Sequence, residues 1–264
     1  MTDDPEEPVL TDVADGVLTV TINRPDRKNA ANAEVWTGLR EAFRAADHDR
    51  EVRTVVVQGA GGDFCAGADL SGGLLGEHPL PGMRMINEAA FALHDLSVPT
   101  VAKVRGVAVG AGWNLALGCD LVIAERDARF SQIFARRGLS LDFGGSWLLP
   151  RLVGMQQAKR LALLAEIIGA EEAERLGLVT TVVEPGTIDA HVAELTKTLA
   201  AGAPVAMAQT KALLHENAGR SFREALESEA RAQSVNFAGS DAPAAFEAFL
   251  EKRDPEFTGG WNVG

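Results

Sequence analysis

Short apolar segments recur along the first part of the chain, and turn-forming residues separate them. The segment GVLTVTI at 16–22 alternates between two sets of side chains, as a half-buried strand does, and NRPD ends the pattern. Three further runs, TVVVQG, VAKVRGVAV and LVIAE, are mostly apolar and predict buried strands at 54–59, 101–109 and 121–125. These runs predict a sheet whose strands are widely spaced in the sequence.

Helical periods lie between these strands. Residues 33–47 repeat apolar side chains at Val35, Leu39 and Phe43, which is the spacing of one helix face. Residues 83–96 show the same period, and a glycine-spaced turn after Val109 opens a short helix. Strand, glycine loop and helix therefore follow one another, as in an α/β architecture built from sequential β units.

The last third of the chain has a different pattern. From about residue 155 it is mostly helical in period, with GLVTTVVEP as the one break, and four helical blocks are expected at 187–200, 204–217, 222–238 and 242–252. We therefore expect an α/β core at 1–200 and a helical region at 201–264. Several of these helices are alanine-rich and amphipathic, which suits packing against another subunit.

Composition narrows the class of function. The 264 residues carry a net charge of −12, which disfavours nucleic acid as a partner because such binding needs a basic face. No apolar stretch approaches the roughly 18 residues of a membrane-spanning helix, and the acidic start, MTDDPEEP, does not resemble an export signal. Cys65 and Cys119 are isolated, which is typical of buried thiols in a reducing compartment, so a cytoplasmic location is expected.

The sequence contains partial matches to several catalytic motifs, and none of them is complete. The five histidines lack metal-ligand spacing, so no metal site is expected. Gly110-Ala-Gly-Trp-Asn-Leu has Leu115 where a dinucleotide-binding fingerprint needs its third glycine. Gly138-Leu-Ser-Leu-Asp ends in Asp142 where the nucleophile elbow of a serine hydrolase needs glycine.

Two glycine-rich segments, FCAGADL at 64–70 and VGAGWNL at 109–115, each follow a strand. They are either tight loops, in which glycine supplies positive φ angles, or loops whose free N–H groups converge on a developing negative oxygen. Their spacing does not separate these two interpretations.

Asp142 stands alone among small and apolar residues in GLSLDFGGSWLLP, at 138–150. A charge is costly in such surroundings unless it has a partner or a function. Asp is a favoured N-cap, and the FGGSWLLPRL that follows is a plausible short helix. On the residues alone the N-cap interpretation is favoured, and a catalytic role stays open.

Five ordered motifs resemble the enoyl-CoA hydratase/isomerase (crotonase) superfamily: TINRPDRKNAAN, GGDFCAGADL, VAVGAGWNLALGCDLVIA, GLSLDFGGSWLLPRLVG and AFEAFLEKRDPEFTGG. The resemblance runs from about residue 15 to the C-terminus. It implies a spiral of stacked ββα units, followed at 201–264 by a helical C-terminal trimerisation region, with a homotrimer or a dimer of trimers as the assembly. It also implies an acyl-CoA thioester as substrate and no separate cofactor, since coenzyme A is part of the substrate.

The resemblance also implies roles for particular residues. The two backbone N–H groups that hold the thioester oxygen fall at Ala68 and Ala111. The two glutamates of hydratases fall at Asn114 and Phe134, and neither side chain can manage a proton as a carboxylate does. Asp142 matches the lone acid of the family's double-bond isomerases. An apolar pocket would raise its pKa and strengthen it as a base once it is ionised.

For coenzyme A, the resemblance implies a set of contacts from both halves of the chain. Phosphate contacts are expected from Arg24, Arg27 and Lys28, and adenine contacts from the backbone of the segment Ala66 to Leu70, which includes Asp69. Lys252 matches a position that reaches the coenzyme A of a neighbouring subunit, and Phe249 an aromatic that packs near it.

Within the family, Asn114, LDFGGSWLLPRLVG and FLEKRDPEFTG are most similar to the ring-epoxide isomerases of phenylacetate degradation, a class that also shifts double bonds in unsaturated acyl-CoAs. The expected function is therefore acyl-CoA isomerisation with one carboxylate base. Two alternatives stay open: a hydratase that adds water to 2-enoyl-CoA, and a non-catalytic binding protein on the same fold, as in members that bind RNA. The sequence does not choose the acyl group.

Overall fold

The computed structural model describes residues 7–71 and 78–261. Its larger sheet has six strands in the order β1-β2-β3-β4-β6-β9. Only the first pair is antiparallel, and the register pairs Val17 with Thr54 and Val101 with Leu121. The strands are β1 (Val9–Ala14), β2 (Val17–Ile22), β3 (Thr54–Gly59), β4 (Thr100–Val104), β6 (Leu121–Glu125) and β9 (Thr181–Val183).

A second, smaller sheet gives the fold its spiral form. It consists of β5 (Val107–Val109), β7 (Arg129–Ser131) and β8 (Ile168–Gly169) in that order. Isolated parallel bridges from Ala31 to Ala68 and from Cys65 to Ala108 continue this ladder toward earlier turns of the chain. Successive turns therefore add one segment to the larger sheet and the next to the smaller ladder, which is the stacked ββα spiral that the motifs implied.

The strand predicted at 101–109 is in fact two strands in different sheets, β4 and β5, and the prediction of one continuous strand is wrong. The chain turns at Gly106, whose φ is +54°. A Cβ at this position would lie 2.3 Å from both Asp63 Oδ1 and the Gly62 carbonyl oxygen, so the turn requires glycine. The contact with residues 62–63 is long-range and is not visible in the local pattern.

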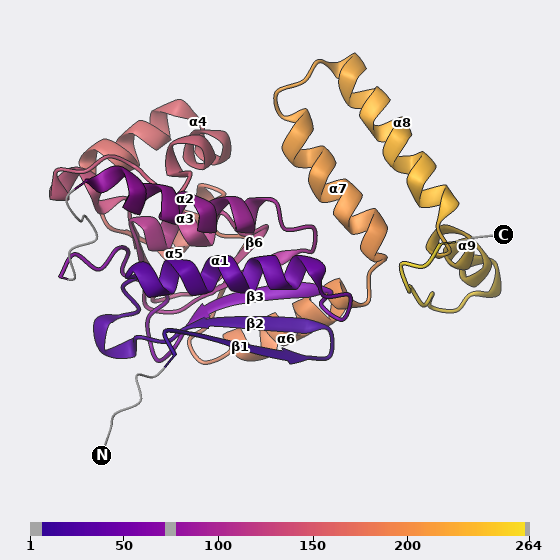
Figure 1. Ribbon diagram of the computed structural model, residues 1–264, viewed down its shortest axis with the longest axis horizontal. Helices are drawn as coiled ribbons and strands as arrows, with labels where there is room; N and C mark the ends of the chain where they lie inside the picture. The colour runs from indigo at the N-terminus through magenta and orange to yellow at the C-terminus, as the bar shows by residue number, and fades with distance from the viewer. Residues whose placement is uncertain (1–6, 72–77, 262–264) are drawn as a thin grey trace.

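Helices cover both faces of the larger sheet (Figure 1). On one face, α1 (Ala33–His48), α2 (Pro79–His94) and α3 (Ala111–Leu117) share a core that includes the fully buried Trp36 and Trp113. On the other face, Ile188 and Val192 of α6 (Ile188–Ala200) pack on Val56, Val101 and Ile123. The remaining elements are α4 (Gly145–Leu164), α5 (Ala170–Arg175) and the 3-10 helices η1 (Pro25–Arg27) and η2 (Ile133–Arg137).

The last three helices, α7 (Pro204–Asn217), α8 (Phe222–Ala238) and α9 (Asp241–Glu251), stand apart from the sheet (Figure 1). We call residues 204–251 the arm. Its large apolar side chains are open to solvent, among them Phe222 at 80%, Phe249 at 81% and Leu250 at 80% exposure. Helix α6, which packs on the sheet, ends at Ala200, and the division into two regions at residue 200 stays a prediction. None of the described helices is both long enough and apolar enough to cross a membrane.

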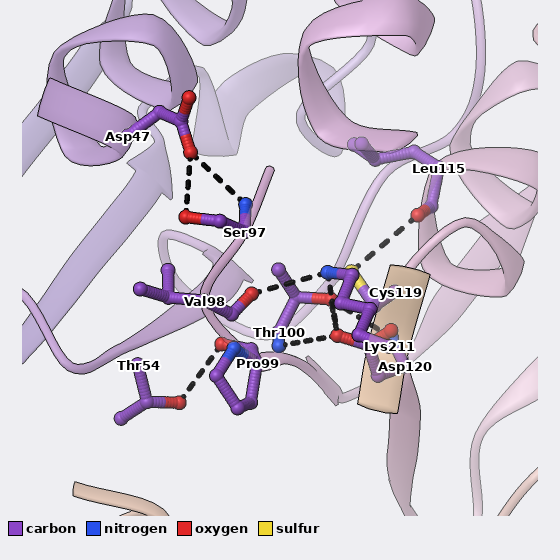
Figure 2. Close-up of polar contacts among 10 residues, drawn as sticks. All are labelled: Asp47, Thr54, Ser97, Val98, Pro99, Thr100, Leu115, Cys119, Asp120 and Lys211. Atoms are coloured by element: carbon purple, nitrogen blue, oxygen red, sulfur yellow. Dashed lines mark hydrogen bonds and ion pairs between the residues drawn. The ribbon is translucent and has the colours of Figure 1, made fainter. Parts of the chain in front are cut away.

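An ion pair attaches the arm to the core (Figure 2). Lys211 of α7 donates from Nζ to Asp120 Oδ2 at 2.8 Å and to the Val98 carbonyl at 3.1 Å. The same carboxylate oxygen accepts from the backbone N–H of Thr100 at 2.8 Å and from its hydroxyl at 2.9 Å. Three donors thus satisfy Asp120, and α7 is held at the start of β4.

Candidate active site

Two loops meet where the smaller ladder begins. Cys65 N–H donates to the Val107 carbonyl and Val109 N–H to the Cys65 carbonyl, both at 3.0 Å. Gly67, with φ at +92°, lies so close that a Cβ there would be 2.8 Å from the Val109 carbonyl oxygen and 3.7 Å from Ala111 N. The absence of a side chain at Gly67 therefore lets the 65–69 loop approach the start of α3.

This junction leaves two amides available. Ala31 N–H donates to the Gly67 carbonyl and Asp69 N–H to the Ala31 carbonyl, both at 2.8 Å, so the Ala68 amide between them is not used by the ladder. Ala111 is the first residue of α3, where a helix has no partner for its N–H. Within 7–71 and 78–261, neither amide donates to a protein acceptor. The left-handed residue of the turn is Gly110, with φ at +56°, so Ala111 keeps an ordinary helical backbone.

Asp142 lies between η2 and α4, mostly enclosed by the protein. Its Oδ1 is buried and has no hydrogen-bond partner among the described residues. Burial raises the pKa of this carboxyl to about 6, against a weaker opposing effect of its own backbone N–H. A carboxylate that is desolvated and unpaired in this way is a basic group at neutral pH.

The N-cap interpretation of Asp142 is wrong. Helix α4 begins at Gly145, and its N-cap is Gly144, in the left-handed region with φ at +77°. The backbone carbonyl of Asp142, and not its side chain, accepts the Gly145 N–H at 2.8 Å. Two consecutive left-handed residues, Phe143 and Gly144, separate Asp142 from the helix, and this turn was not evident from the sequence.

A buried pair of side-chain amides holds the peptide of Asp142. Asn114, on α3, donates from Nδ2 to the Asp142 carbonyl at 2.9 Å. Gln132, which follows β7, donates from Nε2 to Asn114 Oδ1 at 2.8 Å, and both side chains are fully buried. Gln132 was not among the residues predicted for the site. Its signal was a polar residue in the apolar segment FSQIF.

Phe134 also reaches this region. It is buried, and its ring lies 3.6 Å from the position that a Cβ of Gly110 would occupy. Asn114 and Phe134, the two residues matched to hydratase glutamates, thus lie next to Asp142 and to the turn before Ala111. Asp142 therefore supplies an acidic side chain in the region where the two matched glutamates are absent.

A cavity of about 350 Å³ lies between α2, the end of α3 and the start of α4. Its lining includes Phe143 and Gly144, which follow Asp142, and Gly118, which follows α3. Helix α3 therefore runs from the Ala111 amide, past Asn114 at the Asp142 peptide, to the cavity. The other lining residues are Asn87, Ala90, Phe91, Leu93, His94, Trp147 and Leu148.

Trp147 forms a fixed wall of this cavity. The Arg151 guanidinium lies 3.9 Å from the centre of its ring, and the His94 ring meets it edge-on at 5.5 Å. His94 in turn stacks on His215 of the arm at 4.5 Å. Of the apolar residues near Asp142 in the sequence, Phe143 is buried and Leu139 is half exposed.

The residues expected to contact coenzyme A gather only in part. Arg24 pairs with Asp69 at 2.8 Å, and hydrogen bonds from Ser71 and Arg24 lower the pKa of Asp69 to about 2. Lys28 is largely exposed, 3.7 Å from Asp63, and its carbonyl accepts the Ala66 N–H at 3.0 Å. The Arg24 charge is thus already balanced within the protein.

Among the remaining expected contacts, Arg27 and Leu70 face solvent beside this cluster. Phe249 and Lys252 lie in and just after α9, in the part of the chain that stands apart from the sheet (Figure 1). Within one subunit they do not join the site. Across the described ranges, no three His, Cys, Asp or Glu side chains are grouped so as to hold a metal ion.

Comparison with known proteins gives a consistent picture. The sequence model of the family described as Enoyl-CoA hydratase/isomerase matches residues 12–260. The chain is 37% identical over 257 residues to the 1,2-epoxyphenylacetyl-CoA isomerase of Escherichia coli K12, covering 95% of this chain and 98% of that protein. It is 35% identical over 244 residues to the short-chain-enoyl-CoA hydratase of Clostridium acetobutylicum, covering 91% and 93%. The crystal structure of an enoyl-CoA hydratase from Mycobacterium smegmatis matches with a TM-score of 0.90 at 33% identity, covering 96% and 99%.

Proposed function

This chain belongs to the enoyl-CoA hydratase/isomerase family, and from that premise we propose that it is an acyl-CoA isomerase with Asp142 as its single base. The observation that carries the proposal is the Asp142 carboxylate, whose buried Oδ1 has no partner among the described residues. Its pKa of about 6 leaves it ionised at neutral pH yet able to hold a proton.

The proposed reaction moves one proton along the acyl chain. Asp142 takes a proton from C2 of a 3-enoyl thioester, and the electron pair moves onto the thioester oxygen. The N–H groups of Ala68 and Ala111 stabilise the resulting dienolate. Protonated Asp142 then returns the proton to C4, which gives the 2-enoyl thioester without consuming water. Donors of this kind are worth roughly 10²–10³-fold in rate each.

The absence of a carboxylate at positions 114 and 134 favours isomerisation over hydration. Adding water needs one group to activate the water and another to manage the proton. Asn114 is committed to the Asp142 carbonyl and to Gln132, and Phe134 has no ionisable group. Hydration of 2-enoyl-CoA is the second candidate, because a relative with 35% identity carries that name.

We assign the acyl group to the cavity beyond Asp142. Its aromatic wall of Phe91, Phe143 and Trp147 suits a planar ring as well as an aliphatic chain. The name of the Escherichia coli relative, 1,2-epoxyphenylacetyl-CoA isomerase, favours a ring-bearing acyl group, and phenylacetate degradation is the corresponding proposed context.

The proposed assembly is a homotrimer or a dimer of trimers in which the arm packs on neighbouring copies. The exposed aromatic residues of the arm support this, and packing of this kind would bring Phe249 and Lys252 to a neighbour's coenzyme A. Arg27 and Lys28 are the proposed phosphate contacts, and Arg24 takes part through its ion pair with Asp69. Buried thiols at Cys65 and Cys119 suit a reducing, cytoplasmic location.

Product masses separate the two candidate reactions. The purified protein is mixed with 3-enoyl-CoA in one reaction and with 2-enoyl-CoA in another. We expect an unchanged mass with a moved double bond from 3-enoyl-CoA, and little 3-hydroxyacyl-CoA from 2-enoyl-CoA. A product heavier by one water, carrying ¹⁸O from labelled water, would show that the protein is a hydratase.

Isomerisation should depend on pH through Asp142. The ionised form is the base, so kcat should be at its plateau above about pH 6 and fall as pH decreases through that value. The slope below the midpoint should correspond to one proton. A profile of turnover against pH, measured on a folded sample from mildly acidic to mildly basic buffer, checks this. A flat profile across about pH 6 would exclude Asp142 as the base.

A further inference from the structure

The backbone carbonyl of Asp142 has hydrogen-bond partners, whereas Oδ1 of its carboxylate has none among the described residues. Its carbonyl accepts two hydrogen bonds, from Gly145 N–H at 2.8 Å and from Asn114 Nδ2 at 2.9 Å. Oδ1 of the same residue is buried and, within the part of the chain the structure describes, accepts none. The position of the carboxylate therefore depends on the peptide that carries it.

The amide of Asn114 can face Asp142 in only one orientation. A carbonyl oxygen accepts and cannot donate, so Asn114 must present its NH₂ group and turn Oδ1 the other way. Gln132 meets that oxygen with Nε2 at 2.8 Å. Gln132 leaves its own Oε1 buried with no partner among the described residues, which is unfavourable unless the amide has a function.

Packing fixes the same peptide from two sides. A Cβ at Gly145 would lie 2.3 Å from Asn114 Nδ2, so the first residue of α4 rests directly on the amide. Phe143, at φ +46°, is buried, and its ring centre is 5.3 Å from that of Trp36. A left-handed phenylalanine is unfavourable on its own, so its surroundings must hold it there.

The geometry points to Gln132 and Asn114 as positioning residues that hold the Asp142 peptide, and with it the base, just before α4. This inference rests on the proposed function, because it takes Asp142 to be the base. Gln132 acts through Asn114. The resemblance implied no role for Gln132, and for Asn114 it implied the position of an absent glutamate and a likeness to the ring-epoxide isomerases, without a function for its amide.

The test measures the titration midpoint of the Asp142 carboxyl group directly. The infrared carboxyl band is titrated in the original chain and in Gln132→Met and Asn114→Leu, with the matching Asp142→Asn spectrum subtracted in each background. We expect a midpoint near pH 6 in the original chain. In both variants the midpoint should fall by on the order of one pH unit, because a loosened peptide lets the carboxylate reach water.

A matched control is Gln58→Met. Gln58 lies on β3, outside the site, and donates from Nε2 to Thr21 Oγ1 at 3.0 Å, so the variant removes a comparable side-chain donor. Its Asp142 midpoint and its turnover should equal those of the original chain. Circular dichroism of each variant checks that the fold is kept.

Turnover supplies the second readout. In Gln132→Met, the kcat for isomerisation should fall about tenfold with KM unchanged. Adding Gln132→Met to Asn114→Leu should cause no further loss, because the two residues act in series. If Gln132→Met does not fold, the carboxyl midpoint and the kcat of Asn114→Leu test the positioning role instead.

The outcomes distinguish this inference from the proposed function. An unchanged midpoint in folded variants would overturn the positioning role, whatever the original chain catalyses. A shifted midpoint in a protein that does not isomerise 3-enoyl-CoA would leave the positioning role standing and refute the proposed reaction.

Discussion

Asp142→Asn is expected to slow the isomerisation of 3-enoyl-CoA at saturating substrate by roughly 10²–10⁴-fold, the usual contribution of a general base. The substitution keeps the shape of the side chain and removes the carboxylate, which is the proposed base. Binding of acyl-CoA should persist, because the amides of Ala68 and Ala111 and the cavity are unchanged. Steady-state kinetics and titration calorimetry with a non-reactive acyl-CoA measure the two effects.

The same variant should gain stability at neutral pH. Burial raises the pKa of Asp142 from 3.8 to about 6, so the folded chain favours the protonated form. The stability linked to this group is fully present below the unfolded pKa and is lost as pH rises through about 6. The asparagine side chain of the variant stays neutral, so the variant should be up to roughly 3 kcal/mol more stable above that pH and lose this advantage in acid. Denaturant unfolding at a series of pH values measures the difference.

Asp47→Asn is the control for both measurements. Asp47 Oδ1 accepts from Ser97 N–H at 3.0 Å and from its hydroxyl at 2.8 Å (Figure 2), and neither residue lines the cavity. Asparagine retains an acceptor there, so turnover should be unchanged. Near-normal turnover in Asp142→Asn would place the proton shuttle on another group.

Ala111→Pro is expected to slow isomerisation by roughly 10²–10³-fold, the effect of losing one oxyanion donor. Proline removes the N–H without breaking α3, because the first position of a helix tolerates it and needs no N–H partner. Gly110 precedes it at φ 56° and ψ −127°, an extended conformation in mirror image that glycine can keep before proline. The rate of double-bond migration in 3-enoyl-CoA at saturating substrate measures the effect.

The matched variant is Ala33→Pro, at the exposed first position of α1. It makes the same chemical change at an N–H that has no proposed contact with substrate, so turnover and circular dichroism should match the original chain. If Ala111→Pro folds and turns over within a few-fold of the original, the Ala111 amide does not stabilise the reacting oxygen.

The helices and strands that the sequence predicted correctly are those whose pattern lies within their own residues. The strands at 54–59 and 121–125 and the helices at 204–217 and 222–238 have the predicted bounds, because each carries its full period within its own residues. The edge strand β1 was not predicted, since its residues are nearly all exposed and show no alternation. The break at Gly106 was missed because the cause is contact with Asp63, far away in the sequence.

The candidate site was likewise predictable only in part. Asp142 stood out from the sequence because a lone carboxylate among apolar residues is unusual, and Ala68 and Ala111 lie at glycine turns. What the sequence did not reveal depends on side chains that meet only in the fold: the amide of Gln132 on Asn114, and the ion pair of Arg24 with Asp69. Neither pair is close enough in sequence to form a motif.

The spiral has a consequence for a chain that is still being synthesised. The Ala68 amide comes from one turn, the Ala111 amide from the next, and Asp142 only after β7 has joined the smaller ladder. A ribosome-bound fragment that ends at β7, before Asp142, can stack the early turns, because domains fold from the N-terminus as they emerge. Such a fragment carries both amides but not Asp142, so under the proposed mechanism a nascent chain has no activity until the segment after β7 has also left the ribosome.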